Sequence, residues 1–186
     1  MDRAHSLTRW RRPFLAPIWL AILLVAVVAA AAWTFLQSAA TTTVIVVRPP
    51  NDGLPSIPDP PLAADGEEQA ERLARLFGVP DAPERIEAIY VAGTRRLEQL
   101  VAPLAARLGL HPIVFPVAGE EEIPGRALDE HRGESVMIVA GGSAAAEMVE
   151  GLSGIKVDRV HGEEYGQVYI VSVPALGSAG VLELRF

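Results

Sequence analysis

One uncharged apolar run, residues 13–36, constrains this chain more than any other feature. The run exceeds the roughly 20 residues that span the hydrocarbon core of a bilayer, so it predicts a transmembrane helix. Tryptophan rings lie near both of its ends, at positions 10, 19 and 33, and four arginines precede it, at positions 3, 9, 11 and 12. Since basic residues beside a membrane span stay in the cytoplasm, we expect residues 1–12 to be cytoplasmic and the remainder to be periplasmic or extracellular.

A cleaved signal peptide is the alternative interpretation of the same run. Ser38 and Ala40 supply the small residues that a cleavage site requires. However, the apolar region of a signal peptide is only about 7–15 residues long. The length of the run therefore favours an uncleaved anchor, with the membrane as a partner of residues 13–36.

Composition excludes several kinds of chemistry. The chain has no cysteine, which rules out disulfides, thiolate catalysis and cysteine-ligated metal centres. Its net charge is -7, and the part after the apolar run is acidic, so it lacks the basic footprint of a nucleic-acid-binding domain. We predict no cofactor, no metal site and no nucleic-acid partner.

Residues 41–186 alternate between strand and helix patterns. The β-branched run TTTVIVV at 41–47 is typical of a fully buried strand, and it stops at Arg48 before two prolines. Later strands are predicted at 88–91, 113–115, 136–140, 168–173 and 181–184, and helices at 66–77, 95–108, 121–132 and 143–149. This alternation favours one α/β domain of roughly 145 residues with a layered sheet.

Three short motifs follow the predicted strands. The first strand ends in Arg48-Pro49-Pro50, the second leads into VAGTRRLEQLVAPLAARLGL at 91–110, and the fourth ends in Gly141-Gly142-Ser143. In order and spacing these segments resemble the histidine phosphatase superfamily, especially its small bacterial members. The resemblance implies a three-layer phosphoglycerate mutase-like fold with helices on both faces of the sheet. Together with the predicted anchor at residues 13–36, a bacterial origin implies a single-pass protein of the bacterial cytoplasmic membrane.

The same resemblance implies that the catalytic residues are lost. Its two phosphate-binding histidines fall on Pro49 and Gly142, and neither residue supplies an imidazole. A phosphohistidine mechanism needs a ring nitrogen in line with phosphorus, so we expect a poor or inactive phosphatase. Arg96 and Gln99 match the family pattern, whereas its serine and threonine are replaced by Ala92 and Leu100.

Part of an anion site survives these replacements. Arg48 and Arg96 can bind an oxyanion, and the Gly141-Gly142-Ser143 turn is expected to add backbone N–H donors at a helix N-terminus. The structural alternative is that the two arginines only form ion pairs, with partners such as Asp52, Glu98 and Glu164.

Other polar residues are weaker candidates. His161 is a lone loop histidine that would have to act as a substitute base, and Glu121 lies in an acidic run where many family members carry a general acid. The simpler interpretation of that run is an exposed first helical turn that suits the helix dipole. Ser143, with Asp158 and His161 downstream, also resembles a hydrolase triad in its order. His131 is expected to cap a helix.

Three functions remain open at this point. The chain is a degenerate phosphatase-like module that binds a phosphate-like anion or a protein partner, a hydrolase with a relocated nucleophile at Ser143 or His161, or a purely architectural protein of a membrane complex.

Overall fold

The computed structural model describes residues 18–38, 41–49, 59–79, 82, 85–157 and 166–185. The chain divides into two units, Met1–Gln37 and Ser38–Phe186. Several predictions fall outside the described residues, namely the cytoplasmic location of 1–12 and the roles of Asp52, Asp158, His161 and Glu164.

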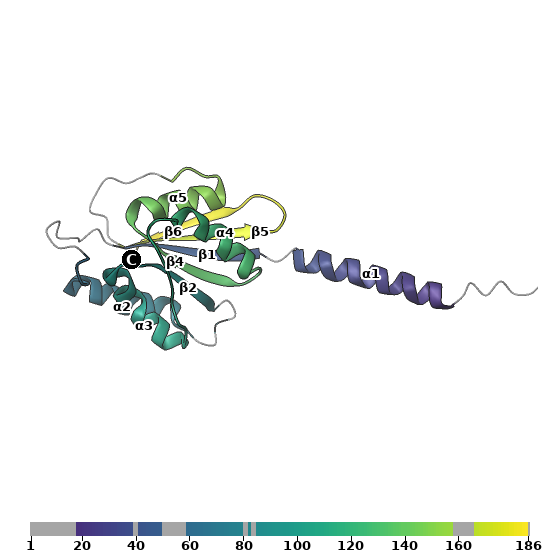
Figure 1. The fold of residues 1–186 in the computed structure, drawn as a ribbon, viewed down its shortest axis with the longest axis horizontal. Coiled ribbons are helices and arrows are strands. Elements are labelled where there is room, and N and C mark those ends of the chain that lie inside the picture. The colour runs from purple at the N-terminus through teal and green to yellow at the C-terminus, as the bar shows by residue number, and fades with distance from the viewer. Residues whose placement is uncertain are drawn as a thin grey trace, which may run out of the picture. The chain divides into compact units, whose positions relative to one another are not determined.

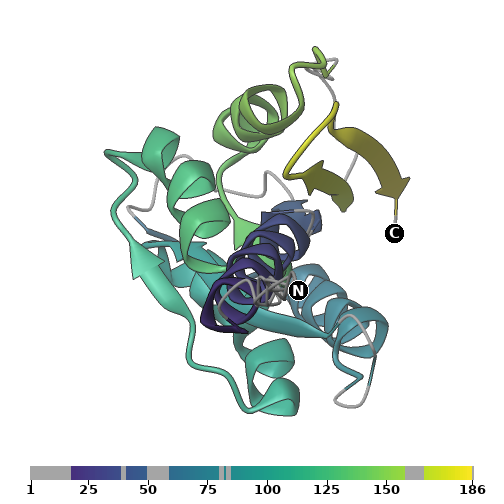
Figure 2. The same cartoon turned by 90° about the vertical axis from the view of Figure 1, so that its right-hand side faces the viewer.

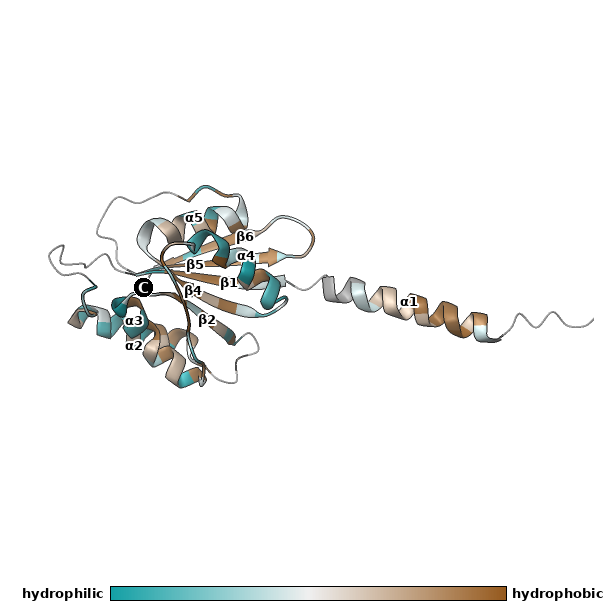
Figure 3. Cartoon of the chain, viewed as in Figure 1, coloured by the Kyte–Doolittle hydropathy of each residue, from teal (hydrophilic) through white to brown (hydrophobic). Residues whose placement is uncertain are grey.

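The first unit contains helix α1 (Ile18–Ser38), which overlaps the predicted apolar run. Its large side chains are exposed, with Trp19, Ile22 and Trp33 each about two thirds accessible, and Figure 3 shows its hydrophobic character. None of the helices that the structure describes has both the length and the apolarity that a membrane crossing requires. The transmembrane helix predicted over residues 13–36 is therefore not supported, and residues 13–17 of that run lie outside the described part of the chain.

The second unit is built on one mixed sheet of six strands. The strands are β1 (Thr41–Arg48), β2 (Ile86–Ala92), β3 (Ile113–Phe115), β4 (Ser135–Val139), β5 (Gln167–Pro174) and β6 (Gly180–Arg185). Their order is β3-β2-β4-β1-β5-β6. The first four pair in parallel, whereas β5 pairs antiparallel with β1 and β6 antiparallel with β5.

Helices cover both faces of this sheet, as Figures 1 and 2 show. On one face lie α2 (Ala64–Phe77) and α3 (Arg95–Leu108), which pack against each other. On the other face lie η1 (Glu120–Glu122), α4 (Ile123–Glu130) and α5 (Gly142–Ser153). The predicted α/β layering is confirmed, because each parallel connection from strand to strand carries a helix back across the sheet.

Burial explains the β-branched first strand. Val44 and Val46 are fully buried on a strand that has β4 on one side and β5 on the other. The sequence of a central strand that is covered by helices on both faces is a continuous apolar run, because neither face of the strand meets water. The core therefore lies around β1, β4 and β2.

Two helices differ from their predicted bounds. The segment predicted as a helix over 121–132 is a 3₁₀ turn, η1, followed by the shorter helix α4. Gly119, at φ 113°, precedes the turn, and Pro124 opens α4, so the regular helix starts late. Helix α5 extends past the predicted end at 149 to Ser153, where Gly154 takes a left-handed conformation at φ 70°.

Candidate functional site

The sequence motifs meet at the carboxyl ends of the parallel strands. β4 lies between β1 and β2, so the residues that follow β1 and β4 are neighbours in space. Ligands of open α/β sheets bind at this edge, where the chain leaves adjacent strands in opposite directions. The sheet order therefore places Arg48, Gly142 and the start of α3 at the edge where a site is expected.

The structure brings Arg48 and Gly142 together. A Cβ atom built on Gly142 would lie 3.2 Å from Arg48 Nε and 3.6 Å from Nη2. These two nitrogens form the edge of the guanidinium that faces the first turn of α5. The absence of a side chain at Gly142 therefore leaves space for the Arg48 guanidinium. Any larger residue at position 142 requires the arginine to shift.

Gln167 holds Arg48 in this place. Arg48 Nη1 donates to Gln167 Oε1 at 3.1 Å, and the Tyr169 hydroxyl donates to the same oxygen at 3.1 Å. Gln167 is 1% exposed, and its Nε2 donates to Glu183 Oε1 at 3.4 Å. Arg48 and Gln167 are partners in the β1–β5 register, so the hydrogen bond follows directly from strand pairing.

This amide partner was not predicted from the sequence. Of the three carboxylates expected to pair with the arginines, only Glu98 is described, and among the described residues it forms no ion pair with Arg48 or Arg96. No pattern in the sequence connects Gln167 to a residue 119 positions earlier, since only the pairing of β1 with β5 makes them neighbours.

The N-terminus of α5 contributes backbone donors. Gly141 is its N-cap residue, in an extended conformation and without a side-chain cap. The first intrahelical bond of the turn runs from Ala145 N–H to Gly141 O at 2.9 Å. The backbone N–H groups that precede Ala145 in the first turn of α5 have no intrahelical acceptor. The helix dipole favours an anion beside them. Ser143 lies exposed on this first turn.

Pro49 is buried directly after β1. Its ring carries no nucleophile and no hydrogen-bond donor. Together with Gly142, it leaves the β1 and β4 ends without an imidazole at either motif position.

Arg96 does not share the contacts that join Arg48 and Gly142. It is half-buried in the first turn of α3 and makes no hydrogen bond or ion pair with the residues that the structure describes. Asp59 Oδ1 accepts from Arg95 N–H at 2.8 Å, so a carboxylate already occupies this helix end. Gln99 Oε1 accepts from Leu62 N–H at 2.7 Å. The structure therefore shows Gln99 holding the segment before α2 in place, a contact that gives it a structural role.

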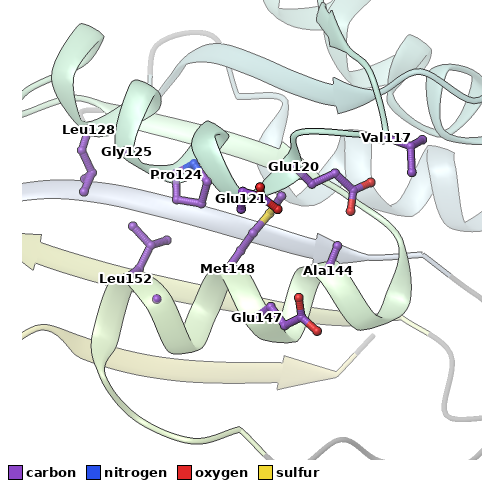
Figure 4. A pocket seen from close by; sticks show the side chains of 11 residues that line it. Val117, Glu120, Glu121, Pro124, Gly125, Leu128, Ala144, Glu147, Met148 and Leu152 are labelled. Carbon is purple, nitrogen blue, oxygen red and sulfur yellow. The ribbon is translucent and has the colours of Figure 1, made fainter.

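The acidic run forms the short 3₁₀ turn η1 and is mostly exposed, as the simpler interpretation of its sequence expected. Glu121 is exposed, but Glu120 is half-buried, and burial raises its pKa, with a smaller contribution from Glu147. Both residues line a groove of about 460 Å³ between η1, α4 and α5 (Figure 4). Among the described residues, no three histidine, aspartate or glutamate side chains gather closely enough to hold a metal ion.

His131 occupies the C-cap position of α4, as predicted, and its backbone N–H donates to Ala127 O at 3.0 Å. Its ring does not reach the helix carbonyls. Instead, Nδ1 lies 2.8 Å from Glu134 Oε2, and the ring meets Tyr90 edge to face at 5.9 Å.

The fold is that of the histidine phosphatases and phosphoglycerate mutases. Solved structures with this fold include the protein histidine phosphatase SixA, with 17% identity, a TM-score of 0.61, and coverage of 77% of this chain and 96% of that one. A putative phosphohistidine phosphatase SixA from Agrobacterium tumefaciens has 16% identity, a TM-score of 0.58 and coverage of 77% and 98%. A phosphoglycerate mutase from Plasmodium falciparum has 14% identity, a TM-score of 0.54 and coverage of 78% and 91%.

No protein-family model matches this sequence, and no curated protein does. The structural likeness therefore shows the fold, because sequences this different share an architecture more reliably than an activity.

Proposed function

We propose that this chain is a catalytically degenerate histidine phosphatase-like module that binds an oxyanion at the end of β1. The observation that carries this proposal is the position of Arg48, whose Nε–Nη2 edge faces Gly142 at the N-terminus of α5. A guanidinium and the backbone N–H groups of a helix N-terminus are complementary to the same kind of ligand, a phosphate-like anion.

The chemistry of the site supports binding more than turnover. An arginine and backbone donors stabilise charge on the equatorial oxygens of a phosphoryl group, but they do not attack phosphorus. Pro49 and Gly142 supply no nucleophile at the two motif positions. The ligand is a free oxyanion or a phosphorylated partner protein, and both present the same group to Arg48.

Tungstate is a suitable probe, since it is bound in the structure of one protein that has this fold. We expect tungstate to raise the thermal unfolding midpoint of the full chain, because a ligand at 100 times its Kd stabilises by about 2.7 kcal/mol. Arg48→Ala abolishes the shift and Arg96→Ala weakens it. Arg72→Ala is the matched control, since Arg72 is an exposed arginine of α2 paired with Glu68, and its removal leaves the shift intact.

Hydrolysis of an aryl phosphate by the same preparations distinguishes the alternatives. We expect none above background. Turnover that is lost in Ser143→Ala or His161→Ala would instead identify a hydrolase with a relocated nucleophile. A thermal shift that is absent, or that persists in Arg48→Ala, would favour the architectural function.

A location at the bacterial cytoplasmic membrane, with residues 41–186 outside the cytoplasm, is part of this proposal. Its support is the sequence of the first unit, in which an uncharged apolar run follows a cluster of arginines. The exposed apolar side chains of α1 are compatible with contact between this segment and lipid or another apolar surface.

A further inference from the structure

Helix α3 begins without a cap from its own residues. Thr94 is the N-cap residue, but its side chain makes no capping hydrogen bond, and its Oγ1 is buried without a partner among the described residues. The N–H groups of Leu97 and Glu98 both donate to Thr94 O at 3.1 Å. The first turn therefore leaves the N–H groups of Arg95 and Arg96 to an acceptor outside the helix.

A carboxylate from another segment takes the first of these positions. Asp59 Oδ1 accepts from Arg95 N–H at 2.8 Å, and Asp59 is an exposed residue at φ 53°. This left-handed conformation is uncommon for a residue that has a side chain. Because a helix N-terminus favours negative charge, Asp59 lies where a bound oxyanion would also be stabilised.

Asp59 belongs to a short segment, residues 59–62, which we call the strap. Its two prolines have no N–H, so Leu62 supplies the next backbone donor, and Gln99 Oε1 accepts from it at 2.7 Å. The Leu62 side chain also packs on α2, where a Cβ built on Gly66 would lie 2.5 Å from Leu62 Cδ1. The strap is thus packed at Leu62, whereas at Asp59 one hydrogen bond joins it to the described residues.

We propose that the strap is an autoinhibitory contact, in which the Asp59 carboxylate occupies the N-terminus of α3 until an oxyanion displaces it. This inference rests on the proposed function, and it gives a role to Arg96, the second arginine of that site. Arg96 directly follows the occupied N–H, is half-buried and has no polar partner among the described residues. Once Asp59 leaves, the Arg96 guanidinium and the first N–H groups of α3 are available to one anion.

Charge and solvation both favour this displacement. A phosphate-like ligand has the same sign of charge as the Asp59 carboxylate, so the two repel each other if both lie at the start of α3. An arginine forms strong bidentate hydrogen bonds with such a ligand. An exposed carboxylate returns to water at little cost, and its release also ends the left-handed conformation of Asp59. Leu62 keeps the strap attached to α2 and α3 throughout.

Asp59→Asn tests the competition, because asparagine keeps an acceptor of the same shape and tolerates the left-handed conformation but removes the charge. We expect tungstate to bind this variant of the full chain about fivefold more tightly than the parent chain, as measured by titration calorimetry. Asp65→Asn is the matched control, since Asp65 is an exposed aspartate in the first turn of α2, and it leaves the affinity unchanged. Equal affinities of the parent chain and Asp59→Asn, or an equal gain in Asp65→Asn, would overturn the proposal.

A double variant assigns the gain to the start of α3. In an Arg96→Ala chain, Asp59→Asn should no longer increase tungstate affinity, because the ligand no longer reaches the guanidinium beside the strap. A gain that persists there would overturn the proposal. Failure of tungstate to bind both the parent chain and Asp59→Asn would refute the oxyanion site itself. Binding that Arg48→Ala abolishes but Asp59→Asn does not change would refute the strap alone.

Discussion

Gln167 determines the geometry around Arg48 through a single buried oxygen. That oxygen accepts from both Arg48 and Tyr169, and the side chain is almost completely removed from water. A buried acceptor shared by two donors is costly to lose, since water cannot easily replace it. The orientation of the arginine therefore depends on a residue four strands later in the chain.

Replacing this amide should reduce both stability and oxyanion binding. We expect Gln167→Met to lower the free energy of unfolding by about 1–3 kcal/mol, because Arg48 and Tyr169 each lose an acceptor. Urea unfolding measures this change, and tungstate affinity should fall with it. Gln69→Met is the matched control, since Gln69 Oε1 is buried without a hydrogen-bond partner among the described residues. An equal loss in both variants would contradict the role given to Gln167.

Tyr90 links stability to alkaline pH. Burial raises its pKa to about 12, and its hydrogen bond to Glu130 at 2.7 Å acts in the same direction. The unfolded chain has the ordinary value near 10, so the folded state binds the proton more tightly. Stability from this group is therefore complete below about pH 10 and is lost as the pH rises toward about 12.

Tyr90→Phe removes this dependence. We expect the variant to be less stable than the parent chain by about 1 kcal/mol at pH 8.5, the usual contribution of one hydrogen bond, and the difference to shrink at pH 11. Urea unfolding at the two pH values gives both differences. A difference that is the same at both pH values would show that Tyr90 does not titrate as described.

At the scale of single elements, helix ends follow local rules that the sequence displays. Gly109 ends α3 in a left-handed conformation at φ 69°, and its backbone N–H donates to Ala105 O. The predicted bounds of this helix, 95–108, agree with the structure. The helix starts are less local, because Asp59 satisfies the first N–H of α3 from a segment 36 residues away.

Two glycine substitutions should change stability in opposite directions. A Cβ meets no atom within 4 Å at either Gly109 or Gly151, so crowding does not decide the outcome. Gly109→Ala forces a left-handed alanine and should cost about 1–2 kcal/mol, whereas Gly151→Ala lies within α5 and should add about 0.5–1 kcal/mol. Thermal unfolding of the two variants tests this, and equal signs would contradict the conformational argument.

At the scale of the whole molecule, the chain is two units with separate physical demands. Ser38–Phe186 contains the entire sheet and its covering helices, whereas Met1–Gln37 contains an exposed apolar helix. A core built wholly within the second unit should not need the first one for its stability.

Removing residues 1–37 should therefore leave the fold intact. We expect the shortened chain to unfold cooperatively with a midpoint equal to that of the second unit in the full chain, and to lose the membrane association proposed for the full chain. Circular dichroism and membrane fractionation measure the two properties. Recovery of the full chain away from the membrane fraction would refute the proposed location, and an unfolded shortened chain would refute the independence of the second unit.

The sequence by itself determined the order of the strands and helices. Periodicity placed β1, α3 and β3 closely, because buried strands and amphipathic helices have distinct patterns within a few residues. The sequence also shows that Pro49 and Gly142, the positions that the resemblance aligns with the family's histidines, carry no imidazole. The bounds of α4 and α5 were less accurate, because Gly119 and Pro124 delay the start of α4 and α5 continues through Gly151 to the left-handed Gly154.

Only the tertiary structure decided which of these residues meet. It brought Arg48 beside Gly142 and Gln167, and it placed Glu120 and Glu147 along one groove. It also tied the segment before α2 to α3, through the hydrogen bonds of Asp59 with Arg95 and of Gln99 with Leu62. Each of these contacts crosses between elements, and strand order and helix packing fix them through interactions distant in the sequence. A single sequence displays local propensity, whereas a site depends on which distant segments the sheet places side by side.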